Sequence, residues 1–162
     1  MPTTRSEPPE LRITRRHLPH WTLDGSIYFV TARLATRPLS APERREVLAQ
    51  VRSGDGRFYR LVAAVIMPDH LHVILKPSPG IALSRIMKGI KGVSARRINR
   101  RRGTRGPVWL HESWDRVIRH QRELLDKIDY MSSNPSKAGL TEDLREYDGW
   151  YWSGEYDVED DE

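Results

Sequence analysis

The segment that most constrains the fold is residues 65–75, where two histidines alternate with apolar residues. Its second half, from Leu71 to Leu75, is apolar and β-branched, which predicts a strand inside a sheet. Because side chains alternate across a strand, His70 and His72 should point to the same face, about 7 Å apart along the strand. This spacing suits a site for one divalent ion, and it also occurs where two polar residues sit on a half-exposed sheet face.

Further strands are predicted on both sides of this segment. Residues 27–34 read as a first strand after an Asp-Gly turn, and residues 58–67 as a second. The short Pro68-Asp69 link predicts that the second strand pairs antiparallel with the histidine strand. Residues 108–118 are expected to supply one more strand.

Three helices are predicted between and after these strands. Ser40 with Glu43 three residues later forms a capping box that opens a helix to about residue 51. An apolar stripe predicts an amphipathic helix over residues 83–100, and Gly89 and Gly92 inside it suggest close packing against a neighbour. A last helix from about residue 121 is expected to end near residue 134, because Pro135 disfavours helical backbone before it. The order of elements predicts an α+β fold, an antiparallel sheet with helices packed on it, of ferredoxin-like type.

Composition places the chain among globular proteins with one domain. Its 162 residues include no cysteine, so disulfides and thiolate metal sites are excluded. No apolar run reaches the length of a membrane span, and the N-terminus lacks a signal-peptide pattern, so a cytoplasmic location is expected. We divide the chain into a basic arm (1–20), a domain (21–153) and an acidic tail (154–162).

The charge distribution is uneven along the chain. Lysine and arginine total 27 and acids 22, yet the last eight residues hold six acids and no base. From His70 to His111 there is no acid at all. A one-sided block of this kind is either a solvated face or a surface for a polyanion, and a pI near 9.7 favours nucleic acid. The candidate DNA-binding residues are Arg15, Arg16, Lys88, Lys91, Arg96, Arg97, Arg100, Arg101, Arg102 and Arg105.

The last predicted helix carries a tyrosine away from its apolar side. Leu124, Leu125, Ile128 and Met131 form the expected apolar stripe. At about 100° per residue Tyr130 falls on roughly the opposite side, and Asn134 follows one turn later on the same face as Tyr130. Most such tyrosines are ordinary surface residues. A phenol and a carboxamide one turn apart are also what a metal-assisted nucleophilic site would use.

The ordered set of motifs resembles the REP-associated tyrosine transposases, single-tyrosine members of the HUH (His-hydrophobic-His) endonuclease superfamily. The resemblance is carried by Met67-Pro-Asp-His-Leu-His-Val-Ile-Leu75 together with the segment from Tyr130 to Leu140. It covers about residues 12–153. It extends to Arg15-Arg-His17, Tyr28-Phe-Val-Thr31, Ile90-Lys-Gly92, Ile98-Asn-Arg100, Val108-Trp109, Trp114-Asp-Arg116, Val117 and Arg119.

The resemblance implies a metal-dependent endonuclease and strand transferase acting on single-stranded DNA beside a palindromic repeat hairpin. His70, His72 and Asn134 would be metal ligands, and Tyr130 the nucleophile that forms a 5′-phosphotyrosine and frees a 3′-OH. Family members use Mg²⁺ or Mn²⁺, whereas imidazole ligands alone would suit zinc or manganese. The resemblance also implies a monomer or homodimer, associated with the nucleoid.

Two other functions remain open on the sequence alone. A non-catalytic nucleic-acid-binding module of the same fold would make Tyr130 dispensable, and a metal-binding regulatory domain would bind without cutting DNA. Trp150-Tyr-Trp152 is consistent either with stacking on unpaired bases or, more commonly, with core packing. The acidic tail is unexpected at the end of a DNA-binding protein, and it would either shield the basic face or solubilise the chain.

Overall fold

A five-stranded antiparallel sheet organises the protein in a computed structural model, which describes residues 25–154. The strands are β1 (Ile27–Leu34), β2 (Tyr59–Ile66), β3 (His70–Pro77), β4 (Trp109–Ile118) and β5 (Trp150–Trp152). Their spatial order is β4-β1-β3-β2-β5 and every neighbouring pair is antiparallel, which confirms the α+β prediction. The basic arm, with Arg15 and Arg16, and all but the first residue of the acidic tail lie outside the described residues.

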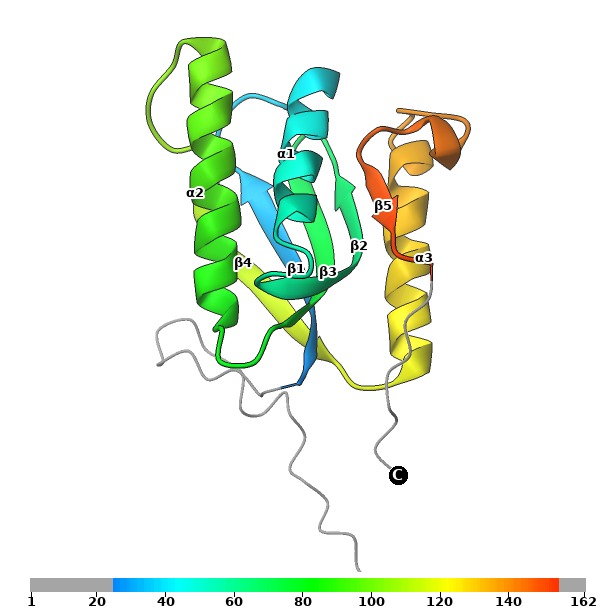
Figure 1. The fold of residues 1–162 in the computed structure, drawn as a ribbon. Helices are drawn as coiled ribbons and strands as arrows, with labels where there is room; N and C mark the ends of the chain where they lie inside the picture. The colour runs from blue at the N-terminus through cyan, green and yellow to red at the C-terminus, as the bar shows by residue number, and fades with distance from the viewer. Residues whose placement is uncertain (1–24, 155–162) are drawn as a thin grey trace, which may run out of the picture.

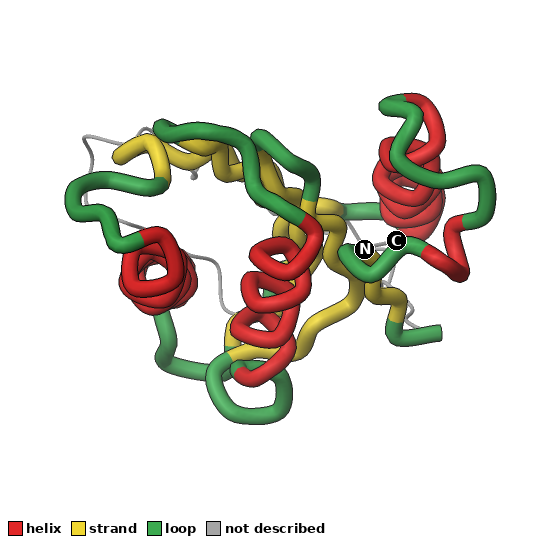
Figure 2. Tube along the Cα trace, turned by 90° about the horizontal axis from the view of Figure 1, so that it is seen from above, coloured by secondary structure: helices red, strands yellow, loops and turns green. Residues whose placement is uncertain are grey.

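Helices cover both faces of the sheet (Figures 1 and 2). On one face, α1 (Ala41–Ser53) and α2 (Leu83–Arg102) pack over a core that includes Val30, Val73 and Leu75. On the other, α3 (Gln121–Lys137) packs over a second core through Leu124, Ile128 and Met131. A 3-10 turn, Leu144–Glu146, then leads to the edge strand β5.

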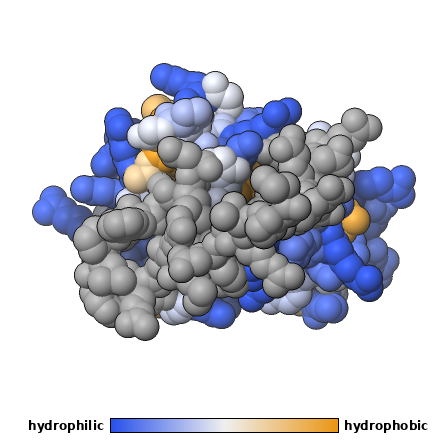
Figure 3. All heavy atoms as spheres, turned by 90° about the horizontal axis from the view of Figure 1, so that it is seen from below, coloured by the Kyte–Doolittle hydropathy of each residue, from blue (hydrophilic) through white to orange (hydrophobic). Residues whose placement is uncertain are grey.

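The part of the domain surface that is coloured in Figure 3 is mainly polar. Seen from below the view of Figure 1, the coloured part of the surface is largely hydrophilic, with small and separate hydrophobic areas (Figure 3). No helix within residues 25–154 is long and apolar enough to cross a membrane. The large hydrophobic side chains exposed in this part of the chain are Phe58, Leu110, Trp114, Leu125, Tyr130 and Leu140.

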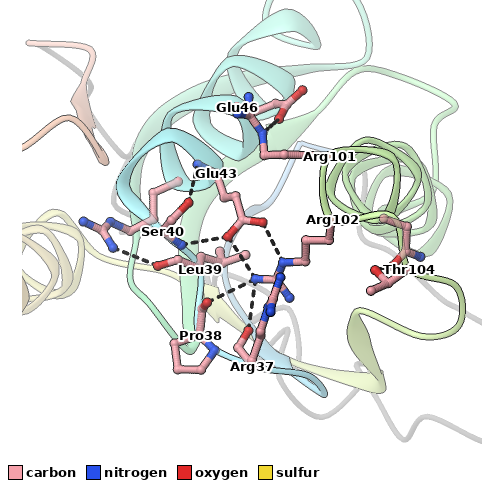
Figure 4. A network of polar contacts seen from close by, with 11 residues as sticks. Arg37, Pro38, Leu39, Ser40, Glu43, Glu46, Arg101, Arg102 and Thr104 are labelled. Carbon is pink, nitrogen blue, oxygen red and sulfur yellow. Dashed lines mark hydrogen bonds and ion pairs between the residues drawn. The ribbon is translucent and has the colours of Figure 1, made fainter.

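The start of α1 is tied to the end of α2 by a buried ion pair (Figure 4). The predicted capping box is present: Glu43 N donates to Ser40 Oγ, and Ser40 N donates to a Glu43 carboxylate oxygen. The Arg102 guanidinium donates to both oxygens of that carboxylate, at 2.6 and 2.9 Å, and to the carbonyls of Arg37 and Pro38. Hydrogen bonding to Arg102 lowers the pKa of Glu43 to about 2. This ion pair therefore joins two helices that are far apart in sequence.

The two glycines of α2 do not mark a close contact, so that prediction was wrong. A Cβ added at Gly89 would meet nothing within 4 Å, and one at Gly92 would meet only the Arg96 side chain at 3.9 Å. Both glycines instead line a groove of about 390 Å³, whose other walls include Phe58 before β2 and Gln50 of α1. The missing side chains widen this groove rather than let a neighbour approach.

The last helix continues through its proline, contrary to the prediction that it ends near Asn134. Pro135 lies inside α3, which runs to Lys137. The reason is packing: Pro135 is buried one turn beyond Met131 and continues the apolar stripe, which offsets the backbone hydrogen bond that proline cannot donate. Leu125 was assigned to that stripe and is 49% exposed, so it lies outside the core.

Candidate active site

The two histidines lie on the face of the sheet that α3 covers. They occupy β3, which has a strand on either side, and the register sets His72 between Thr31 of β1 and Val65 of β2. Their ring centroids are 4.8 Å apart at an interplanar angle of 70°. The same-face prediction from strand alternation is confirmed.

Each histidine is oriented through its Nδ1. His72 Nδ1 lies 2.8 Å from Thr31 Oγ1, and His70 Nδ1 lies 2.7 Å from Asp69 Oδ1. With the proton on Nδ1, each ring donates to its oxygen partner and keeps a lone pair on Nε2. This is how a neighbouring oxygen fixes the tautomer of a metal-binding histidine.

The Nε2 atom of His72 is buried and has no hydrogen-bond partner within the described part of the chain. Burial lowers the pKa of His72 to about 3, and the positive charges of His70, Arg33 and Lys127 add to this effect. The Phe29 ring stacks on the imidazole at a centroid distance of 5.0 Å. His72 is therefore a neutral imidazole, and in the tautomer protonated at Nδ1 its Nε2 offers the lone pair that a metal ligand requires.

Tyr130 brings a phenol to the same place from α3. Its ring centroid is 5.6 Å from that of His72 at an angle of 60°, and the residue is 50% exposed. Asn134 follows one turn later in the same helix and is partly buried. The tertiary structure thus brings together three of the four predicted site residues, with Asn134 one helical turn away from Tyr130.

The residues present fit a divalent ion with two imidazole ligands. Across residues 25–154 no cluster of three or more histidine, aspartate or glutamate side chains could hold a metal by itself. A complete set of protein ligands therefore needs an oxygen of another kind, such as the Asn134 amide. The unpartnered Nε2 of His72 is the observation that favours a ligand here.

Comparison with known proteins finds sequences and structures of transposases. A family model described as "Transposase IS200 like" matches residues 42–117, a segment that contains both histidines and ends before Tyr130. A Haemophilus influenzae protein, provisionally named a REP-associated tyrosine transposase, is 24% identical over 138 residues, which are 76% of this chain and 77% of that protein. A solved structure of a REP-associated tyrosine transposase bound to a REP hairpin aligns with a TM-score of 0.61 and 20% identity, covering 80% of this chain and 78% of that one.

The chain is similar in sequence and in fold to REP-associated tyrosine transposases. The family resemblance expected from the motifs is therefore confirmed, as is the fold.

Most of the cations predicted to bind DNA lie on the side of the sheet opposite the histidines. All eight that the structure describes belong to α2 or to the loop after it, and α2 packs on the face opposite the histidines. Five of these cations are exposed and take part in none of the ion pairs found among the described residues. They are Lys88, Arg96, Arg97, Arg100 and Arg105.

Three of these predicted cations have structural partners. Arg102 is the clear correction: its side chain is 4% exposed because it is buried against Glu43, so it presents no charge to a phosphate. Arg101 pairs with Glu46 at 3.1 Å, and Lys91 donates to the carbonyl of His111 and to Ser113 Oγ.

Sequence reasoning missed the residues that surround the histidines. Thr31 and Phe29 were part of the quoted motifs but had no role, and Arg33 and Lys127 were not considered. Alternation along β1 places Phe29, Thr31 and Arg33 on one face, and Lys127 lies one turn before Tyr130. Which face of β1 meets the histidines depends on strand pairing across 41 residues of sequence, which no local pattern shows.

Proposed function

We propose that the protein is a metal-dependent, single-stranded DNA endonuclease and strand transferase that acts beside palindromic repeat hairpins through a 5′-phosphotyrosine intermediate. The observation that supports this most is the half-exposed phenol of Tyr130, in ring contact with a histidine whose buried Nε2 has no partner among the described residues. A nucleophile and an unused metal-ligand atom side by side are what phosphodiester transfer requires.

Tyr130 attacks the phosphorus of the scissile phosphodiester. A bond forms between the phenol oxygen and phosphorus, and the bond from phosphorus to the 3′ oxygen breaks. The phenol proton passes to solvent and the departing 3′ oxygen takes up a proton, so one diester replaces another. The step is reversible because the ester bond is kept, and a second 3′-OH can therefore reseal the strand.

His70, His72 and Asn134 would hold a Mg²⁺ or Mn²⁺ ion. When bound, the ion offsets the charge that develops on the phosphate oxygens during transfer. Thr31 and Asp69 keep both imidazoles in a fixed tautomer and orientation through Nδ1. Phe29, stacked on His72, excludes water from one side of the ring.

The substrate class is proposed from the relatives. One solved relative is described as bound to a REP hairpin. We infer that this chain also takes a DNA hairpin with an unpaired flank, as a monomer or homodimer. The exposed cations of α2 are consistent with a polyanionic partner.

A denaturing gel tests the proposal. End-labelled hairpins with single-stranded flanks, taken from repeats near the gene, are incubated with protein and Mn²⁺ or Mg²⁺. The wild-type protein should give a labelled adduct that survives denaturation. Tyr130→Phe should give none, because phenylalanine has no oxygen to attack phosphorus, while hairpin affinity stays near wild type.

Tyr151→Phe is the matched control, since Tyr151 lies at the edge of the opposite core beneath Arg52. It should form the adduct as the wild type does. Tight binding without any adduct from the wild-type protein would instead favour a non-catalytic binding module of the same fold.

A further inference from the structure

The site lies in a row of side chains that crosses the whole sheet. Strand register sets Trp114 of β4 beside Thr31, Thr31 beside His72, His72 beside Val65, and Val65 beside Trp150 of β5. Residues directly across a sheet point to the same face. The β5 end of the row is packed: Val65 is buried and Trp150 packs against the core beneath α3. The β4 end is open.

Trp114 is the exposed member of this row. The residue is 42% exposed, and the Arg33 guanidinium lies over its ring at 5.9 Å from the centroid. A large indole at the open edge of a sheet leaves an unusual amount of apolar surface in water. Strands lie about 4.8 Å apart, so the backbone of Trp114 is about 10 Å from that of His72.

Two cations lie near this row of side chains. Arg33 is exposed on β1, and Lys127 of α3 has its Nζ 4.9 Å from the centroid of the Phe29 ring. Phe29 in turn stacks on His72 at a centroid distance of 5.0 Å, so Lys127 lies over the ring that covers this histidine.

Two acids beside this surface are already paired. Asp69 is held by His70 at 2.7 Å, and Glu123 is held by Arg116 at 2.6 Å. Arg33 beside Trp114 and Lys127 beside Phe29 are therefore positive charges that a phosphate chain can contact on this face.

We propose that Trp114, Arg33, Phe29 and Lys127 form a platform that binds the unpaired DNA strand and leads it to Tyr130. A base stacks on Trp114, and the phosphates beside it contact Arg33 and Lys127. Aromatic side chains interleaved with cations are the usual means of binding single strands without sequence readout. That the bound strand is the substrate of Tyr130 rests on the proposed function. That this surface binds single-stranded DNA does not depend on it.

The distance of about 10 Å between the backbones of Trp114 and His72 sets where the stacked base lies along the DNA strand. Stacked nucleotides rise about 3.4 Å each along one strand. A base on Trp114 is then about three nucleotides from the phosphate beside His72. The single-stranded flank, rather than the duplex stem, is the part of the DNA that this platform holds.

The protein contains a matched control on its other side. Phe58 is also 42% exposed and also has an arginine over its ring, Arg57 at 5.3 Å. It lines the groove between α1 and α2, on the layer away from Tyr130. A general loss of exposed aromatic surface would affect both positions, whereas the platform predicts an effect at Trp114 alone.

Binding is measured by fluorescence anisotropy with a labelled oligothymidylate of about twelve nucleotides, a length within the range of single-strand sites. The buffer contains EDTA and the protein carries Tyr130→Phe, so no cleavage can contribute. Trp114→Ala should weaken binding about tenfold, as should Trp114→Leu, which keeps the apolar bulk. Trp114→Phe should stay within about threefold of the parent protein, because it keeps an aromatic face for stacking. Phe58→Ala should change nothing.

Thermal unfolding shows which variants are still folded, and only these are compared. Unchanged affinity of a folded Trp114→Leu protein overturns the platform, as does an equal loss of affinity in Phe58→Ala. The covalent-adduct assay with the hairpin and the wild-type protein is run in parallel with these binding measurements. If the adduct forms and depends on Tyr130 but the Trp114 variants bind normally, the platform proposal is rejected and the proposed function stands. If the Trp114 variants lose affinity but the wild-type protein forms no adduct, the platform stands and the endonuclease proposal is rejected.

Discussion

The two faces of the sheet differ although they are built from the same strands. On the α1–α2 face, β3 contributes Leu71, Val73 and Leu75, all with 0% exposure. On the α3 face the same strand contributes His70, His72 and Ile74 in alternation with them. One face is a continuous apolar core that is closed at the helix ends by the ion pair of Glu43 and Arg102. The other is an apolar core that is interrupted at one end by the imidazoles of His70 and His72, and its β4 edge carries the partly exposed Trp114.

This difference teaches how a small α+β domain can separate stability from chemistry. A buried imidazole nitrogen without a hydrogen-bond partner costs free energy, and so does an exposed tryptophan. The apolar face and its ion pair offset such costs without placing any functional group in the core. The following experiments test whether substitutions on one face change stability without changing activity, and substitutions on the other change activity without changing stability.

The largest effect is expected from the histidines. His70→Ala should reduce adduct formation on the order of a thousandfold, because one of the two proposed imidazole ligands is lost while Tyr130 remains. Excess Mn²⁺ should restore only part of the activity. Calorimetric titration with Mn²⁺ should show the matching loss of affinity in the absence of DNA.

His111→Ala is the control for this prediction, since His111 lies exposed on β4 and only its carbonyl serves Lys91. It should bind Mn²⁺ as the wild type does. Equal Mn²⁺ binding by His70→Ala would place the ion elsewhere and would end the metal assignment on the α3 face.

The next effect is on stability and belongs to the opposite face. Arg102→Met leaves the Glu43 carboxylate buried without its partner, and should lower the free energy of unfolding by about 3 to 5 kcal/mol at neutral pH. Since the folded pKa of Glu43 is about 2 against an ordinary 4.5, the stabilisation by this pair is complete above 4.5 and is lost as pH falls toward 2. The difference between variant and wild type should therefore shrink across that range in urea titrations.

Arg101→Met provides the comparison for that prediction, because its pair with Glu46 is 48% and 27% exposed and should contribute no more than about 1 kcal/mol. Adduct formation by folded Arg102→Met protein should remain near wild type. A large loss of activity in that protein would show that the two faces are coupled.

The smallest effect concerns the cations of α2. Neutralising Arg96, Arg97 and Arg100 together should flatten the salt dependence of hairpin binding, by about one unit of slope for each phosphate that is no longer neutralised. The salt dependence of oligothymidylate binding should not change, because the proposed single-strand platform lies across the sheet. An unchanged slope with the hairpin would mean that the duplex lies on another face.

Local patterns predicted most of the elements and the orientation of the histidine pair. Alternation along residues 70–75 placed His70 and His72 on one face, and the capping box at Ser40 and Glu43 marked the start of α1. These features depend on residues within a few positions of one another. The edge strand β5 was not predicted, because three residues carry no readable period.

The sequence by itself determined four of the five strands, the three helices except for the end of α3, and the shared face of the histidines. It also determined the helical turn that joins Tyr130 to Asn134. Tertiary structure decided the rest, because those outcomes depend on contacts between distant segments. Burial of Pro135 beneath the sheet carried α3 past its expected end. Pairing of β1 with β3 set Thr31 against His72, and the meeting of α1 with α2 turned Arg102 from a surface cation into a buried partner of Glu43. Each of these outcomes follows from burial and long-range pairing, whose energies no local window of sequence contains.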